Sequence, residues 1–131
     1  MEYTIDFGGS PQDVTVTVAG VATARAFHLY NEELTSDPRF RAGMTILVDA
    51  TGLDTSELLA GGQLETAARP LAERDWEYPP LAVAVIAPDP ATFEAMRLGQ
   101  AHLGGTGFRR RAFLTREDAL AWLAEKRNGA A

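Results

Sequence analysis

Cysteine is absent from the chain, which excludes disulfide bonds and thiolate metal sites. Only two histidines are present, so a zinc site would also lack nitrogen ligands. Basic residues number 12 against 18 acidic ones, and this net charge of −6 disfavours nucleic acid or an anionic membrane as partner. No run reaches the roughly 18 apolar residues that a membrane helix needs, and the start, Met1–Thr4, lacks the features of a signal peptide. These absences predict a cytoplasmic protein without metal or cofactor.

The amino-acid composition is that of an ordinary folded domain. Its 131 residues are 46% hydrophobic and 23% charged, which is close to the average for globular proteins. A chain of this size buries about two-thirds of its unfolded surface, enough to fold without covalent staples. We therefore expect one domain over residues 1–127 and a short flexible tail over 128–131.

The N-terminal part changes its hydrophobic period once. Apolar and polar residues alternate over 3–7 and 14–18, around a Gly/Pro turn, and this predicts a β-hairpin. From Thr23 to Ser36 the period becomes that of a helix, with Thr23 as its N-cap and Pro38 beyond its end.

The rest of the chain alternates strand and helix patterns. The expected elements are a strand over 44–48, a helix over 54–77 that is broken or starts late, a strand over 81–87, a helix over 91–103, a strand over 109–114, and a helix capped by Thr115 with Trp122 as its core anchor. The two continuously apolar strands, 44–48 and 81–87, should be central because only strands covered on both faces tolerate such runs. Strands alternating with helices form parallel βαβ units. The sequence predicts a single-domain α/β protein with a predominantly parallel sheet of about five strands, an antiparallel N-terminal edge strand and four helices.

Several of these segments carry a family resemblance. They are Asp37–Phe40 before Ile46–Asp49, then Val83–Pro88, and finally Phe113 followed by Glu117–Leu123. In this arrangement the chain resembles SpoIIAA-like, STAS-type domains, the family of bacterial anti-sigma-factor antagonists and their uncharacterised relatives. The resemblance implies the STAS fold and a non-enzymatic module that binds a protein or a ligand, switched in some members by phosphorylation.

One segment matches the phosphorylated motif of those antagonists in part. Their serine lies in an Asp-Ser-Ser/Thr-Gly-Leu motif that opens the helix after the second core strand. The matching residues here, Asp54–Leu58, keep two hydroxyls, Thr55 and Ser56, but lack the Gly-Leu pair. A helix start favours a bound or covalent phosphate, although exposed hydroxyls are also ordinary residues there. Thr55 and Ser56 are therefore candidate phosphorylation or interaction sites.

Two acidic residues flank an expected Thr51-Gly52 turn in the same region. Asp49 and Asp54 would lie at the carboxyl end of a central strand, the edge where open α/β sheets bind ligands. Paired carboxylates there could hold Mg²⁺ or act as acid and base. The structural interpretation, which we favour, is that Asp54 caps the next helix in a capping box with Glu57 and that Asp49 ties the turn.

An aromatic segment offers a second candidate site. Trp76 and Tyr78 precede a Pro-Pro pair and the strand over 81–87. Together with two glycines after the helix start they could cover an apolar pocket beneath the segment Gly61–Pro80. Aromatic residues at such junctions also simply close the core.

The remaining polar candidates have structural interpretations. The basic run Arg109–Arg111 lies in the last predicted strand, where it is expected to discourage edge-to-edge pairing more than to bind an acidic partner. His28 and His102 are expected on the surface.

We expect a non-catalytic regulatory or scaffold module that binds a protein partner at the Asp54–Ser56 helix start. The alternative is a carrier or sensor of a small apolar or acyl ligand in the pocket beneath Gly61–Pro80. A homodimer is compatible with either function.

Overall fold

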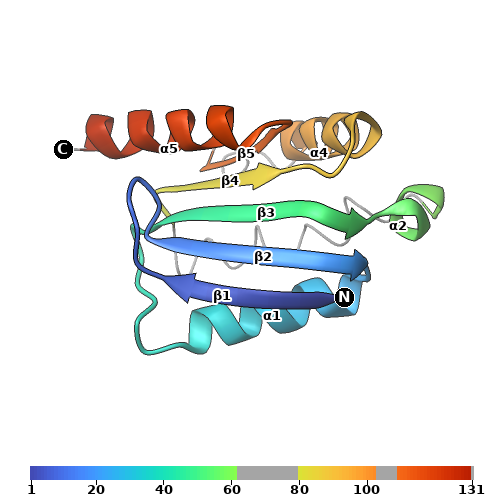
Figure 1. The fold of residues 1–131 in the computed structure, drawn as a ribbon, viewed down its shortest axis with the longest axis horizontal. Helices are drawn as coiled ribbons and strands as arrows, with labels where there is room; N and C mark the ends of the chain where they lie inside the picture. The colour runs from blue at the N-terminus through green and yellow to red at the C-terminus, as the bar shows by residue number, and fades with distance from the viewer. Residues whose placement is uncertain (62–79, 103–108, 131) are drawn as a thin grey trace.

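The computed structural model describes residues 1–61, 80–102 and 109–130, with the backbone alone at 99–102 and 130. Its elements in chain order are β1 (Glu2–Phe7), β2 (Val14–Val21), α1 (Ala24–Ser36), β3 (Thr45–Asp54), α2 (Ser56–Ala60), β4 (Ala82–Ile86), α4 (Pro90–His102), β5 (Arg110–Phe113) and α5 (Arg116–Ala130) (Figure 1).

The sheet has five strands in the order β1-β2-β3-β4-β5. Strand β1 pairs antiparallel with β2, and the other three pairings are parallel. This confirms the predicted mixed α/β sheet, its antiparallel N-terminal edge and the inner positions of the two apolar strands. Four helices lie among the described residues, as predicted.

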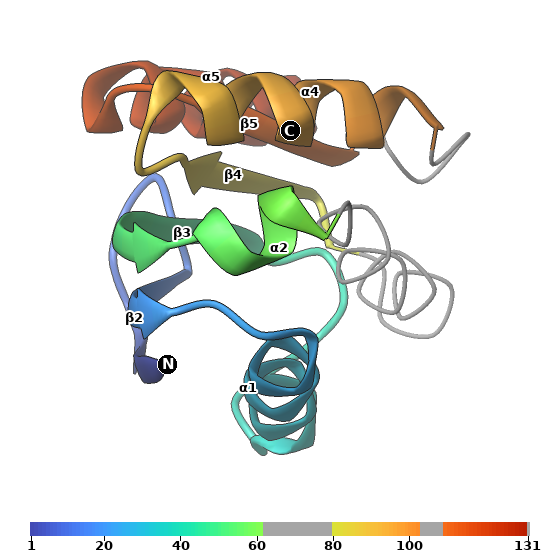
Figure 2. The same ribbon diagram turned by 90° about the vertical axis from the view of Figure 1, so that its right-hand side faces the viewer.

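Two hydrophobic clusters lie on opposite faces of this sheet. The larger cluster packs the α1 stripe of Phe27, Tyr30 and Leu34 against β2 and β3. The smaller cluster packs α5 against β3, β4 and β5. Figure 2 shows α1 beside β2, and α4 and α5 at the β4–β5 side. The outer face of β1 and β2, opposite α1, consequently keeps exposed residues such as Thr4 and Thr17.

Local signals set the helix boundaries. The Thr23 hydroxyl accepts a hydrogen bond from the backbone N–H of Ala26 at 3.1 Å, which confirms the predicted N-cap of α1. At the start of α5 the Thr115 hydroxyl likewise accepts from the N–H of Asp118 at 3.2 Å. Helix α5 continues to Ala130, beyond residue 128, where the tail was expected to begin.

Trp122 is a core residue, as expected. It is buried, and its ring centroid lies 5.6 Å from that of Phe113 on β5. Among the described residues no helix combines the length and the apolar character needed to cross a membrane.

Candidate functional site

Strand β3 runs further than its apolar stretch indicates. It continues to Asp54, so the turn expected at Thr51-Gly52 is wrong. The pairing with β2 shifts register here: Thr17 faces Asp49 and Ala19 faces Gly52, which is a β-bulge in β3. A Cβ on Gly52 would lie 3.2 Å from the Ala19 Cβ, so this glycine serves close strand packing and not a turn.

Because of this extension, Asp49 and Asp54 are not a pair. They lie five residues apart along one strand, about 16 Å at the usual rise per residue. One oxygen of Asp49 accepts hydrogen bonds from the N–H and hydroxyl of Thr51, at 3.1 and 2.7 Å, and the other lies 3.6 Å from an Arg116 guanidinium nitrogen. No cluster of three or more His, Asp or Glu residues suited to a metal occurs in the described part of the chain.

Asp54 stabilises the start of α2, but it lies one residue before the N-cap position that was predicted for it. The N-cap position is occupied by Thr55, whose side chain makes no capping hydrogen bond, so the expected Asp54 cap and its capping box with Glu57 are wrong. The Asp54 Oδ1 atom accepts from the N–H of Ser56 at 3.0 Å and from its hydroxyl at 2.7 Å. These bonds, first that from the hydroxyl and then that from the backbone, hold the pKa of Asp54 below its usual range.

Thr55 and Ser56, expected to be alternatives, occupy opposite environments. Thr55 is 2% exposed, and its Oγ1 atom lies 2.6 Å from the Oγ1 of the fully buried Thr92 on α4. The N–H of Thr92 in turn donates to the Asp89 carboxylate at 2.7 Å. Ser56 is exposed. Of the two candidates, only Ser56 is accessible to a kinase or a partner.

Sequence reasoning missed the Thr92 contribution to this region. A signal was present, because Asp89 precedes Thr92 by three residues at the start of α4, a spacing typical of helix caps. The sequence did not indicate the contact between Thr55 and Thr92, which lie 37 positions apart.

The second candidate site is only partly within the described residues. Trp76 and Tyr78 lie outside them, as does most of the segment Gly61–Pro80. At the Pro80 end there is a cavity of about 20 Å³ between α1 and the sheet. Its described lining residues are Val16, Tyr30, Asn31, Leu34, Thr35, Phe40, Ile46, Val48, Pro80, Val83 and Arg110.

Two buried polar side chains line this cavity. Burial raises the pKa of the Tyr30 phenol, and the charge of Arg110 opposes that rise. Asn31 is 7% exposed. About 10–15 Å³ suffices for one water molecule, so the cavity has room for a water beside these groups.

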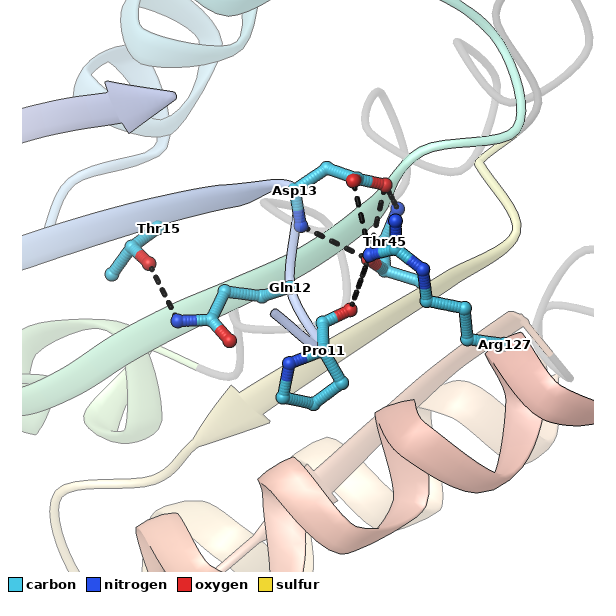
Figure 3. A network of polar contacts seen from close by, with 6 residues as sticks. All are labelled: Pro11, Gln12, Asp13, Thr15, Thr45 and Arg127. Atoms are coloured by element: carbon cyan, nitrogen blue, oxygen red, sulfur yellow. Dashed lines mark hydrogen bonds and ion pairs between the residues drawn. The ribbon is translucent and has the colours of Figure 1, made fainter. Parts of the chain in front are cut away.

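A third polar cluster, which the sequence did not predict, lies at the amino end of β3 (Figure 3). One oxygen of the Asp13 carboxylate accepts from the N–H and hydroxyl of Thr45, at 3.0 and 3.2 Å, and the other lies 3.0 Å from an Arg127 guanidinium nitrogen. The single Thr45 hydroxyl proton is shared between Asp13 and the nearer carbonyl oxygen of Pro11, at 2.7 Å, and Arg127 donates to the same carbonyl at 3.0 Å. This cluster joins the hairpin, β3 and the end of α5.

The other candidates keep peripheral positions. Arg110 and Arg111 lie on β5, which forms one edge of the sheet, and Arg111 also stacks 5.4 Å from the Phe113 ring centroid. His28 is exposed on α1, as expected, and the side chain of His102 lies outside the described residues.

Comparison with known proteins supports this architecture. No protein-family model matches the chain, and no curated protein matches it. The structure is similar to that of an uncharacterized protein from the DUF3478 family with a SpoIIAA-like fold, from Shewanella loihica PV-4. The TM-score is 0.54 and the sequence identity 20%, over 92% of this chain and 93% of the other. The protein therefore has a SpoIIAA-like α/β fold, as its sequence resemblance implied.

Proposed function

We propose that this protein is a non-catalytic regulatory or scaffold module that binds a protein partner through the edge Asp54–Ser56. The SpoIIAA-like fold is consistent with such a module. The observation that carries the proposal is the buried contact between Thr55 and Thr92, because it anchors the residue between two exposed polar ones. Asp54 and Ser56 are then presented in one defined geometry, which reduces the entropy that a partner must remove on binding.

The chemistry of this edge suits a partner that donates hydrogen bonds. The Ser56 hydroxyl proton is used by Asp54, and Asp54 Oδ2 forms no hydrogen bond with the described residues. Both the Ser56 oxygen and Asp54 Oδ2 can therefore accept hydrogen bonds from a partner's Lys, Arg or backbone N–H groups.

Site-specific cross-linking tests the proposal directly. A photoreactive amino acid is introduced in place of Ser56 or, as control, of Ser36, which is exposed at the end of α1. Both variants are expressed in cells of the organism that encodes the protein, and cross-linked products are identified by mass spectrometry. We expect one reproducible partner at position 56 and none at position 36. The same products at both positions, or none at either, would remove this edge as the interface.

A charge substitution then tests whether the partner binds at this edge. Ser56→Glu should leave the protein folded, because a negative charge is tolerated in a first helical turn. It should weaken the complex, because it replaces the small Ser56 hydroxyl by a longer side chain and removes the hydrogen bond to Asp54 that orders this edge, whereas Ser36→Glu should not. Equal affinities of the Ser56→Glu and parent proteins would place the interface elsewhere.

The second candidate function is a carrier or sensor of a small apolar ligand beneath Gly61–Pro80. The cavity that Pro80 lines, at the end of this segment, favours it. Native mass spectrometry of protein purified from its own host separates the two functions. A retained mass of a few hundred daltons supports the carrier, and a protein adduct supports the module.

A further inference from the structure

The proposed function leaves the β1 edge of the sheet unused. Among the described residues, strand β1 pairs with β2 alone. An edge strand presents unpaired backbone groups to which another chain can bind.

The hairpin pairing identifies these open groups. The N–H of Gly8 donates to the carbonyl of Asp13, so the pair Gly8–Asp13 is of the hydrogen-bonded type. Hydrogen-bonded pairs recur at every second residue of an antiparallel ladder, and β1 has no register shift. Glu2, Thr4 and Asp6 therefore direct their backbone groups to β2. The N–H and C=O groups of Tyr3, Ile5 and Phe7 point to the open edge.

Apart from the two acidic side chains of Glu2 and Asp6, strand β1 lacks the features that usually protect an edge. It has six residues with no proline, no lysine and no bulge. The opposite edge, β5, is shorter, with four residues, and begins with two arginines. The two edges therefore differ in length and in the sign of their charge: β5 is short and basic, and β1 is longer and acidic.

The side chains of β1 define what would fit there. Glu2 and Asp6 are exposed on the outer face, and no ion pair involves either of them among the described residues. Their neighbours in register on β2 are Ala19 and Thr15, which supply no positive charge. On the other face, half-buried apolar side chains pack toward α1.

We propose that β1 accepts an extended segment of a protein partner as a sixth strand, with basic residues opposite Glu2 and Asp6 and apolar residues between them on the α1 side. Opposite charges across a strand pair stabilise it, and like charges destabilise it. A second copy of this chain fits less well, because both edges would carry the same acidic pair and each chain has a net charge of −6. This surface is distinct from Asp54–Ser56, so each proposal can fail without the other.

A designed peptide tests the edge without knowledge of the natural partner. The probe has the sequence Lys-Val-Thr-Val-Lys-Val, fluorescently labelled, and its Lys-Val-Thr-Val-Lys core reads alike in both strand directions. The control peptide replaces both lysines with glutamate. The full chain carries any purification tag at its C-terminus, and binding is followed by fluorescence anisotropy at 50 and 200 mM salt. We expect the lysine peptide to bind at least tenfold more tightly than the glutamate peptide, and less tightly at the higher salt.

Matched charge reversals locate the binding surface. The double variant Glu2→Lys, Asp6→Lys should lose at least tenfold in affinity for the lysine peptide and gain affinity for the glutamate peptide. The control, Glu117→Lys with Glu125→Lys, makes the same change in net charge at exposed positions on α5 and should bind nearly as the parent does.

Hydrogen exchange supplies a readout that non-specific charge attraction cannot produce. On peptide binding, the amides of Tyr3, Ile5 and Phe7 should gain protection, while those of Thr4 and Asp6, already paired with β2, should change little. Failure of the lysine peptide to bind at 1 mM, equal binding by the two double variants, or protection gained elsewhere would overturn the proposal. A dimer by light scattering that protects the same three amides without peptide would also overturn it, in favour of a second copy as occupant.

Discussion

The two ends of β3 carry similar chemistry, an aspartate beside a hydroxyl, in two different constructions. At the amino end Asp13 meets Thr45, 32 residues away, and Arg127 joins them from the last part of α5. At the carboxyl end Asp54 meets Ser56, only two residues away, and both remain exposed. The first cluster ties three distant elements together, and the second orders only its own loop.

This difference indicates which end of β3 is available to bind a partner. Thr45 is 1% exposed, and its hydroxyl both donates to and accepts from groups of the hairpin. A substitution there must therefore lower the stability of the fold. Asp54 and Ser56 keep acceptor positions open to solvent. A partner can use the carboxyl end without disturbing the core, whereas the amino end is a structural joint.

The largest effect is expected from removing the side chain of Trp122. This residue anchors α5 to the sheet, and α5 carries the Arg127 of the amino-end cluster. Trp122→Ala should destabilise the protein by about 3–5 kcal/mol, because it removes a buried aromatic side chain from the contact with Phe113. Chemical denaturation monitored by circular dichroism measures this loss. A variant that melts within a degree or two of the parent would show that α5 is peripheral, and the amino-end cluster would then not be a joint.

The next largest effect is expected at the amino-end cluster itself, formed by Asp13, Thr45 and Arg127. Asp13→Ala should cost roughly 1.5–3 kcal/mol, because it leaves the buried Thr45 N–H without its charged acceptor. Arg127→Ala should cost less, within about 1 kcal/mol, because this guanidinium is 44% exposed. Urea denaturation of both variants checks the order. Equal costs would mean that the ion pair, and not the bond to β3, is the important contact.

The buried hydroxyl pair that supports the carboxyl end should show coupling. Thr55→Val and Thr92→Val should each destabilise the protein by about 1–2 kcal/mol, because each leaves one buried hydroxyl without its partner. The double variant should cost less than the two single changes together, since both hydroxyls are then replaced by methyl groups. A double-mutant cycle in urea measures the coupling, and strict additivity would contradict the contact.

The smallest effect is expected at Asp54 and follows pH. Hydrogen bonds from Ser56 lower the Asp54 pKa below 3.8, so the stability they contribute is fully present above that unfolded value and is lost as pH falls through the folded pKa. Carboxyl-carbon NMR titration should give a midpoint below 3.8 in the parent, and Ser56→Ala should raise it. An unchanged midpoint would remove the bond from the Ser56 hydroxyl.

Asp37 serves as an internal standard for this titration. Hydrogen bonds from the Arg39 side chain and backbone lower the Asp37 pKa to about 2, and Ser56→Ala should leave that value unchanged. Arg39→Gln should raise the midpoint of Asp37 without moving that of Asp54.

Much of the fold could be predicted from the sequence, because the deciding signals are local. The period-two run before Gly8, the helical stripe of α1 and the Thr23 and Thr115 caps each act within a few residues and appear in the structure as predicted. The limits of β3 could not be predicted, because residues 51–54 continue the strand only by pairing with β2 across a bulge. Asp54 is for the same reason one residue too early to cap α2.

By itself, then, the sequence determined the mixed sheet and the order and type of the elements that the structure describes. Periodicity, capping and the lack of long apolar or basic runs act through near neighbours, and near neighbours are visible in a sequence. Only the tertiary structure decided that Thr55 is buried against Thr92, that Asp49 and Asp54 are separate, and that Asp13 and Arg127 meet at Thr45. Those outcomes depend on which distant backbone segments are brought into contact when the two faces of the sheet are covered, and no local pattern encodes such contacts.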